Sequence, residues 1–312
     1  MNNRNQTTEF ILLGLSSLPV HQRLLFVVFL LMYFTTLLGD VAIITVIKMD
    51  AQLHSPMFFF LCHFSFVDIC VVSITVPQLL IILLSERKSI SFSACIAQLF
   101  FFLWICNMEF FLLASMAYDR YVAICRPLHY TMVVSKNVCV QMVTVSWVVT
   151  ALHALLHTLM TSHLSFCASN IIHHFFCDVP PLLKLSCSDI SINELVIFTE
   201  GGLMLLCPLI FITVSYVGII STILKIRSIE GRSKAFSTCS SHFTLVALFY
   251  GSVFFMYFRP STSFALDYDR VVSVVYTILI PMANPFIYSL RNKDVKMALQ
   301  KAFGRAKMSC KM

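Results

Sequence analysis

The chain has 312 residues, of which 58% are apolar and only 12% are charged, and its mean hydropathy is +0.85. Soluble domains carry about 25% charged residues, so this composition excludes a soluble globule and indicates an integral membrane protein. The net charge of +7 then reflects membrane topology and contact with anionic lipid, and it gives no reason to expect nucleic acid as a partner. Because a membrane bundle needs no separate hydrophobic cores, we expect one domain over residues 1–312.

Apolar stretches long enough to cross about 30 Å of hydrocarbon predict an all-α fold with seven transmembrane helices. In chain order they are residues 24–47, 57–84, 95–124, 138–161, 195–224, 237–258 and 271–290. The sixth is the weakest, because a polar turn precedes its apolar part. After the seventh, apolar residues at helical spacing predict a short amphipathic cytoplasmic helix over residues 292–304, lying on the membrane surface. Cys310, beyond it, is a candidate for palmitoylation.

Basic residues predict the orientation. Most of the 22 Lys and Arg residues lie on the side of the carboxyl terminus, so the positive-inside rule makes that terminus cytoplasmic and the amino terminus extracellular. Asn5 begins the sequon Asn5-Gln6-Thr7, which is glycosylated only on the outer side. We therefore expect a multi-pass protein of the plasma membrane.

Three acids lie inside predicted membrane helices: Asp40, Asp68 and Glu109. Counted from the inner helix ends, they and Asn284 share one depth, roughly 10 to 16 Å at 1.5 Å per residue. Ionisable groups so deep usually face the bundle interior. Three carboxylates at one site do not all stay ionised without a cation, so we expect this cluster to hold Na⁺ or a proton. The alternative is one protonated acid that is hydrogen-bonded to the backbone.

Asp119 and Arg120 stand side by side at the inner end of the third helix. The Arg head reaches the aqueous boundary while its stem stays in apolar surroundings. A neighbouring carboxylate would hold the guanidinium until a partner competes for it, which describes a two-state element. The plainer interpretation is a basic residue that anchors the helix end at the interface, but anchoring does not require the Asp.

Four cysteines fall on the predicted outer side, which faces an oxidising compartment. They are Cys95, Cys167, Cys177 and Cys187. Four cysteines allow three pairings, and their spacing leaves the choice open. The alternative is a metal site built from His173, His174 and Cys177, which we rate below disulfides because thiolate ligands are usually kept reduced.

Six motifs follow one another along the chain. They are LHSPMFFFLCHFSFVD (53–68), MAYDRYVAICRPLHY (116–130), SY (215–216), KAFSTCSSHF (234–243), FYG (249–251) and PMANPFIYSLRNKDVK (281–296). In this order and spacing they closely resemble the motifs of rhodopsin-like G protein-coupled receptors and, among these, of olfactory receptors. The sixth predicted helix has no Pro between Ser237 and Phe258, which is similar to the olfactory branch. The resemblance implies a rhodopsin-like seven-helix receptor for odorants, and not an enzyme.

The resemblance also implies roles for single residues. It pairs Cys95 with Cys177 and Cys167 with Cys187. It assigns a cytoplasmic switch, in which Arg120 contacts the G protein after the sixth helix moves outward, and a second switch on the seventh helix with Tyr216 as its partner on the fifth. The residues of the two switches are Asp119, Arg120, Tyr121, Asn284, Pro285, Tyr288 and Tyr216.

Two further points follow from the resemblance. The family usually couples to a stimulatory olfactory G protein and raises cyclic AMP. Where its first helix usually reads Gly-Asn, this chain has Gly39-Asp40, which adds the third acid to the cluster. We therefore expect the ion or proton occupancy of the cluster to differ from that of other members.

A ligand cavity is expected in the outer half of the bundle. If Glu109 faces inward, residues three, four and seven positions before it lie on the same face of the third helix. The resulting ligand-binding residues are Phe102, Ile105, Cys106, Glu200, Met204, Tyr250, Gly251, Val253, Val274 and Thr277. Such a cavity is mostly apolar. At ~25 cal/mol per Å², a small volatile gains only a few kcal/mol, which predicts micromolar affinity and broad tuning.

Two local features of the sequence leave alternatives open. Glu200 either pairs with an amine odorant or is solvated at the interface near the outer loop. His153 and His157, four residues apart, could frame a metal, but packing or interface placement is the plainer interpretation, and we expect no metal site.

Other functional classes fit less well. A transporter would show broken helices in two related halves, and a membrane enzyme would show a nucleophile, base or metal set; neither pattern is found in the sequence. Within receptors, the alternative is a rhodopsin-like receptor for an endogenous small ligand, which the motifs do not separate from an odorant receptor.

Overall fold

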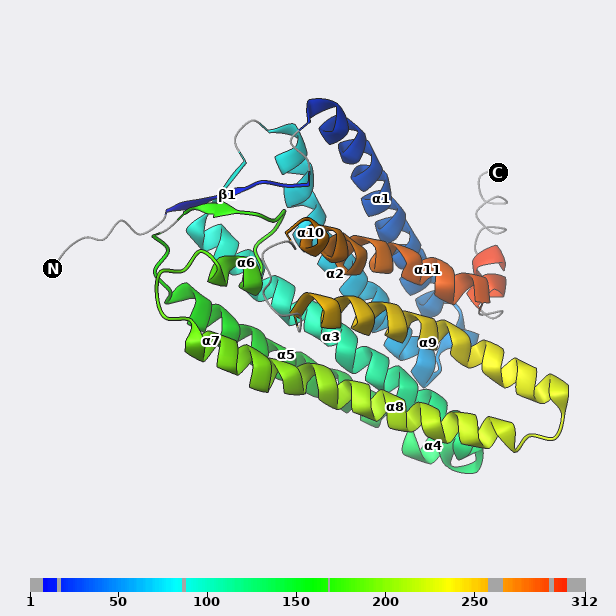
Figure 1. Cartoon of the computed structure of the whole chain (residues 1–312). Helices are drawn as coiled ribbons and strands as arrows, with labels where there is room; N and C mark the ends of the chain where they lie inside the picture. Colours follow the sequence, from blue (N-terminus) through cyan, green and yellow to red (C-terminus); the bar gives the residue numbers. More distant parts are fainter. Residues whose placement is uncertain are drawn as a thin grey trace, which may run out of the picture.

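The computed structural model describes residues 8–15, 18–85, 88–167, 169–257, 266–291 and 295–301. Its long helices pack into one bundle, in which α3 contacts α2, α5, α8 and α9 (Figure 1). The first four bundle helices are α1 (Pro19–Met49), α2 (Pro56–Leu84), α3 (Phe92–Cys125) and α5 (Lys136–Ser162). Pro19 and Pro56 open α1 and α2 at a position where the missing N–H of proline costs nothing.

The fifth and seventh bundle helices each contain a π-helical turn. The fifth runs through α7 (Ser191–Val196), the turn Ile197–Gly201 and α8 (Gly202–Leu224). The sixth is α9 (Ile229–Tyr257). The seventh runs through α10 (Leu266–Val274), the turn Val275–Leu279 and α11 (Ile280–Arg291). A π turn inserts an extra residue and rotates the side chains that follow, and such turns are frequent at functional sites.

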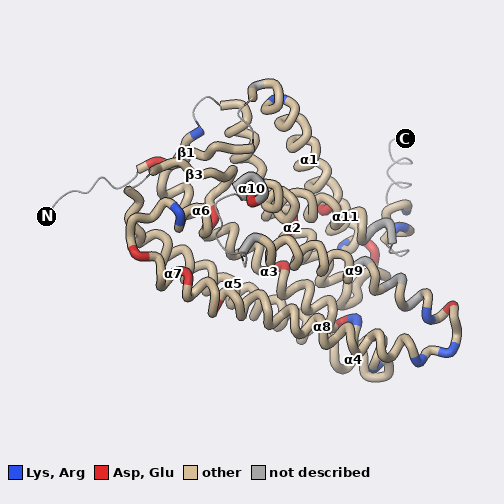
Figure 2. Tube along the Cα trace, viewed as in Figure 1, with Lys and Arg blue, Asp and Glu red and all other residues tan. Residues whose placement is uncertain are grey.

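The surface of the bundle suits a membrane. Six described helical spans are long and apolar enough to cross one, and α9 carries a shorter apolar segment over His242–Phe255. Leu24, Leu31 and Leu38, seven residues apart, form an exposed stripe on α1 that lipid would cover. Figure 2 shows few charges along the helices and a gathering of Lys and Arg near α4 (Tyr130–Val133) and the turn between α8 and α9. The predicted seven-helix membrane fold, with its weak sixth helix, is confirmed.

A small sheet, which the sequence did not predict, covers one end of the bundle. Its strands β1 (Glu9–Leu12), β2 (Ser89–Ser91) and β3 (Ile171–Ile172) lie in the order β2-β1-β3, with β1 antiparallel to β2 and parallel to β3. We call this end the sheet end, and the opposite end, which carries α4, the α4 end. Strands of two to four residues are too short to show an alternating pattern.

Two glycines permit close contacts between helices. A Cβ atom on Gly39 would lie 2.9 Å from Pro285, so α1 and α11 approach each other beside the acid cluster. A Cβ atom on Gly218 would lie 2.6 Å from the Tyr121 ring, so α8 packs directly on α3 near Asp119. A larger side chain at Gly39 would press on the Pro285 ring, and one at Gly218 would require the Tyr121 ring to move.

The predicted surface helix is described only in part. Residues 295–301 are helical, and their apolar side, Val295 and Ala298, is buried against the main core. Residues 292–294 and 302–304 of the predicted helix, together with Asn5 and Cys310, lie outside the described residues.

Candidate functional site

A small cavity lies inside the bundle toward the sheet end. Its volume is about 70 Å³, which is room for roughly two water molecules. The lining residues come from the third and fourth bundle helices, which are α3 and α5, and from the short helix α6 (Val179–Leu183). The fifth, sixth and seventh bundle helices supply the rest. They are Phe102, Leu103, Cys106, Asn107, Phe110, His153, His157, Val179, Ile197, Gly201, Leu205, Val253 and Tyr276. Most are apolar, as is usual for a small-molecule site.

Three predicted ligand-binding residues line this cavity: Phe102, Cys106 and Val253. The other seven, which do not line it, are Ile105, Glu200, Met204, Tyr250, Gly251, Val274 and Thr277. The fifth bundle helix lines the cavity with Ile197, Gly201 and Leu205 instead. Gly201 and Leu205 each follow by one residue the predicted positions Glu200 and Met204. Phe110 also lines the cavity, and it stands four residues after Cys106 on the same face of α3. The sequence analysis missed it because it counted only from Glu109 toward the outer end of the helix.

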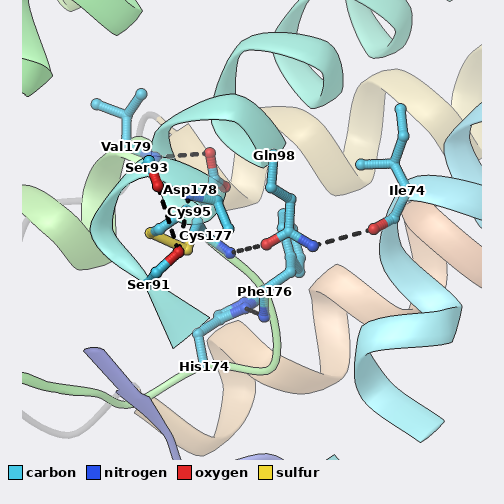
Figure 3. The surroundings of a disulfide bond; sticks show 11 residues. Ile74, Ser91, Ser93, Cys95, Gln98, His174, Phe176, Cys177, Asp178 and Val179 are labelled. Atoms are coloured by element: carbon cyan, nitrogen blue, oxygen red, sulfur yellow. Dashed lines mark hydrogen bonds between the residues drawn. A yellow bond between two sulfur atoms is a disulfide. The ribbon is translucent and has the colours of Figure 1, made fainter. Parts of the chain in front are cut away.

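The loop between α5 and α7 is fastened over the cavity by disulfides. Cys95 bonds to Cys177, and Cys167 bonds to Cys187, as the family resemblance implied. Figure 3 shows Gln98 beside the first disulfide: its Oε1 accepts the Cys177 N–H at 2.9 Å, and its Nε2 donates to the Ile74 carbonyl at 3.0 Å. One glutamine therefore joins the loop to both α3 and α2.

The same loop is also bonded to α10. His174 Nε2 lies 2.9 Å from Ser273 Oγ, and the Arg270 guanidinium donates to the His173 carbonyl at 3.0 Å. The Phe176 N–H donates to His174 Nδ1, so the ring proton is on Nε2 and points to Ser273. Burial, together with the nearby Arg270 charge, lowers the pKa of His174 to about 3. His174 therefore stays neutral and holds the loop through these structural bonds. The alternative metal site with Cys177 is excluded because the sulfur of Cys177 is in the disulfide.

The predicted acid cluster consists of buried side chains. Asp40, Asp68, Glu109 and Asn284 are almost inaccessible to solvent. Asn284 Nδ2 donates to both carboxylate oxygens of Asp68, at 3.0 and 2.9 Å. Among the described residues, the carboxylate oxygens of Glu109 have no hydrogen-bond partner, and those of Asp40 form no hydrogen bond of good geometry, although the Ser65 side chain lies near them. Buried carboxylates without partners are costly unless a proton or a cation neutralises them.

At the α4 end, Asp119 is bonded differently from the expectation. Its Oδ1 accepts a 2.7 Å hydrogen bond from the Tyr130 hydroxyl, and it forms no ion pair with Arg120, whose buried Nε has no partner among the described residues. The expectation that Asp119 holds the guanidinium is thus wrong for this conformation. Burial and the bond to Asp119 raise the pKa of Tyr130, so its hydroxyl remains a donor at neutral pH. The short turn Pro127–His129 brings Tyr130 back to α3.

Tyr216 also has a partner that the sequence analysis missed. Its hydroxyl lies 2.7 Å from His242 Nδ1, and His242 Nε2 lies 3.1 Å from the Leu113 carbonyl. Since a carbonyl only accepts, Nε2 carries the proton and Nδ1 accepts from Tyr216. His242 thereby joins the fifth, sixth and third helices. The side chain of Tyr288, on α11, lies outside the described part of the chain.

Glu200 points toward α5. Its carboxylate lies 2.8 Å from His153 Nδ1 and 2.9 Å from His157 Nε2. The two histidines are buried, and Glu200 is partly exposed. The sequence identified these three residues separately but did not bring them together.

Comparison with known proteins agrees with this architecture. A family model described as "Olfactory receptor" matches residues 29–306. Olfactory receptor 1C1 of Homo sapiens is 54% identical over 303 residues, which cover 96% of this chain and 96% of that protein. Olfactory receptor 1E16 of Mus musculus is 50% identical over 310 residues, which cover 99% of each chain. The chain belongs to the olfactory receptor family of G protein-coupled receptors, which are non-enzymatic signalling proteins of the plasma membrane.

Proposed function

We propose that this receptor binds a small, mostly apolar odorant in the cavity at its sheet end and activates a stimulatory heterotrimeric G protein at its α4 end, raising cyclic AMP. The observation that carries the proposal is the course of α3, which lines the cavity with Phe110 and carries Asp119 and Arg120 in its last two turns, toward the α4 end. Ten residues of helix separate Phe110 from Arg120, or about 15 Å. A single rigid element therefore links the two sites.

The size of the cavity supports activation through a change of shape. Its volume of about 70 Å³ is far below the roughly 300 Å³ at which ligand pockets begin. An odorant must therefore push side chains or helices apart to enter. Among the lining elements, α9 packs less extensively on α3 than α5 and α8 do, so it is the element that yields most easily.

Movement of α9 would reach the G protein side through His242. Val253 of α9 borders the cavity, and His242 lies three turns away on the same helix. When α9 moves outward, the bonds from His242 to Tyr216 and to the Leu113 carbonyl break together. The surface between α3 and α9 then opens, and Arg120 becomes free to bind the G protein.

The acid cluster would hold a proton or Na⁺ in the resting receptor. Asp40, Asp68, Glu109 and Asn284 would supply the ligands. The carboxylate oxygens of Asp40 and Glu109, which form no hydrogen bond of good geometry among the described residues, fit such an occupant. When bound, the cation or proton neutralises buried charge that would otherwise destabilise the bundle.

The remaining assignments are consistent with this topology. The sheet end, with its two disulfides, would be extracellular, which places Asn5 where glycosylation occurs. The α4 end, where Lys and Arg gather, would face the cytoplasm and its anionic lipid (Figure 2). One domain over residues 1–312 would carry both functions.

A cyclic AMP assay in transfected cells tests the proposal. Cells expressing the receptor are exposed to odorants grouped by chemistry, and the variant Arg120→Ala, matched for surface expression, should be silent to every activating odorant. His163→Ala, an exposed position at the end of α5, serves as the control that should respond normally. A response that survives Arg120→Ala would refute the assigned signalling route.

A further inference from the structure

His153, His157 and Glu200 form a compact cluster that the signalling scheme does not use. His153 and His157 lie one turn apart on α5, and Glu200 comes from the π-helical turn Ile197–Gly201 of the fifth helix. One ligand atom from each residue lies within 4.8 Å of the other two. Two imidazoles and a carboxylate make a donor set that binds Zn²⁺ in many proteins.

The geometry needs little adjustment to hold a metal ion. His153 Nδ1 and His157 Nε2 lie 2.8 and 2.9 Å from the same carboxylate oxygen, Glu200 Oε2. Donors on a tetrahedral ion at bond lengths of about 2.1 Å are roughly 3.4 Å apart. Lengthening each of these two contacts by about half an ångström, with the two nitrogens already within 4.8 Å of each other, would therefore replace the hydrogen bonds by three metal bonds. Each neutral imidazole binds through the nitrogen that now faces Glu200, and its proton moves to the other ring nitrogen.

Burial favours a metal as well. The side chains of His153 and His157 are only 7% and 6% exposed, while that of Glu200 is 35% exposed, which leaves a path to the site. A divalent cation compensates the carboxylate charge within the membrane-spanning region, where unpaired charge is costly.

We propose that His153, His157 and Glu200 form a site for a divalent transition-metal ion, with Zn²⁺ as the best fit. His153, His157 and Gly201 also line the cavity. The three protein ligands leave a fourth tetrahedral position, which a water molecule or a donor atom of a cavity ligand fills. The ion joins the fourth bundle helix, α5, to the fifth bundle helix, which contains the turn Ile197–Gly201, at the wall of the cavity.

Metal binding to the purified receptor tests the site. Co²⁺, whose visible absorption reports a tetrahedral nitrogen and oxygen environment, is titrated into receptor in nanodiscs and then displaced by Zn²⁺. His153→Ala and His157→Ala should each weaken Co²⁺ binding at least tenfold. The exposed His163→Ala and Glu194→Gln, matched in residue type, should leave it unchanged.

Glu200→Gln keeps the shape of the side chain and one acceptor oxygen for the histidines, but it removes the charge. Glu200→Gln tests the site even if a histidine variant does not fold, because Glu200→Gln is titrated only after its melting temperature has been shown to match that of the wild type. A Co²⁺ affinity reduced at least tenfold in this folded variant supports the site. Absence of a tetrahedral Co²⁺ spectrum in the wild type, or an equal affinity in Glu200→Gln, overturns it.

The effect of the ion on signalling rests on the proposed function and is measured separately. Zn²⁺ at concentrations that fill the site should shift the odorant response of the wild type at least threefold, and it should not shift that of Glu200→Gln. Tetrahedral Co²⁺ binding without any effect of Zn²⁺ on the response would keep the site and refute its regulatory role. Metal binding in a receptor that no odorant activates would count against the proposed function and not against the site.

Discussion

Substitution of Gly201 by valine tests whether the cavity in the bundle is the odorant site. Gly201 lines the cavity, and a Cβ atom placed on it meets no heavy atom within 4 Å. The backbone there is helical, with φ −62° and ψ −36°, so valine fits without strain in the main chain. The new side chain therefore projects into space that a ligand would use.

The size of the effect follows from the carbon atoms that are added. A ligand that shares the cavity with the valine loses contact equivalent to two or three methylene groups, which at ~0.8 kcal/mol each amounts to about 2 kcal/mol. The odorant concentration for half-maximal response should then rise roughly 30-fold. Gly201→Ala should give a smaller shift, of about fourfold, because it displaces about one such group.

Gly251→Val is the matched control. Gly251 lies on α9, its added Cβ atom also meets nothing within 4 Å, and it does not line the cavity. Both substitutions replace a helical glycine by the same residue, so their effects on helix propensity are alike. The assay is the cyclic AMP dose response for several odorants at equal surface expression.

The outcome separates the cavity in the structure from the one expected from the sequence, which included Gly251 and not Gly201. A 30-fold shift for Gly201→Val with an unchanged Gly251→Val supports the cavity. An equal shift in both variants, or a shift only in Gly251→Val, would refute the reasoning.

Three further predictions concern the two ends of the bundle. Tyr130→Phe removes the donor to Asp119, a charged hydrogen bond worth about 2 kcal/mol. The freed Asp119 carboxylate should then pair with the guanidinium of Arg120 and raise the odorant concentration for half-maximal cyclic AMP response about tenfold. Asp119→Asn added to the same chain should reverse this shift. The pKa of His174 is lowered from 6.5 to about 3, so between these two pH values the unfolded chain binds a proton that the folded chain does not. The stability of the fold is therefore full above pH 6.5 and decreases below it, by about 2 kcal/mol at pH 5. Thermal unfolding should show this loss in the wild type and a smaller loss in His174→Gln. Gln98→Leu removes two hydrogen bonds and should lower the unfolding free energy by about 2 kcal/mol, whereas an unchanged melting temperature would mean that Gln98 does not fasten the loop.

The helices and their order were predictable because each crossing needs about 20 apolar residues, a signal that local sequence carries by itself. The disulfide pairing, by contrast, came from the resemblance, since spacing alone allowed three pairings. The common depth of Asp68 and Asn284 and their burial followed from helix rise and from the cost of burying a charge, whereas the hydrogen bonds between them were not predicted. The sheet was missed because β1 pairs with strands about 80 and 160 residues away, and its strands are too short to carry a pattern.

The residues expected to bind the ligand come from helices that do line the cavity, but most of them lie on other faces, and the expectation did not include α5 and α6. Counting in steps of three and four assumes a regular helix, and it fails to account for the π turns at Ile197–Gly201 and Val275–Leu279. The residues that reach the cavity from those turns are Ile197, Gly201 and Tyr276; the last two stand where counting had given Glu200 and Thr277. Gly201 and Tyr276 are each displaced by one residue from the predicted one, about 100° around the helix axis.

That displacement also changes the meaning of Glu200. On the predicted face it would be an open carboxylate waiting for an amine; in the structure it faces α5, where His153 and His157 satisfy it. A charged ligand group would have to break two short hydrogen bonds before it could bind there. The charge is therefore better suited to joining two helices, directly or through a metal ion, than to selecting amines. By the same logic, the odorants that activate this receptor should be chosen by shape against an apolar wall, with Asn107 as a polar lining residue on α3.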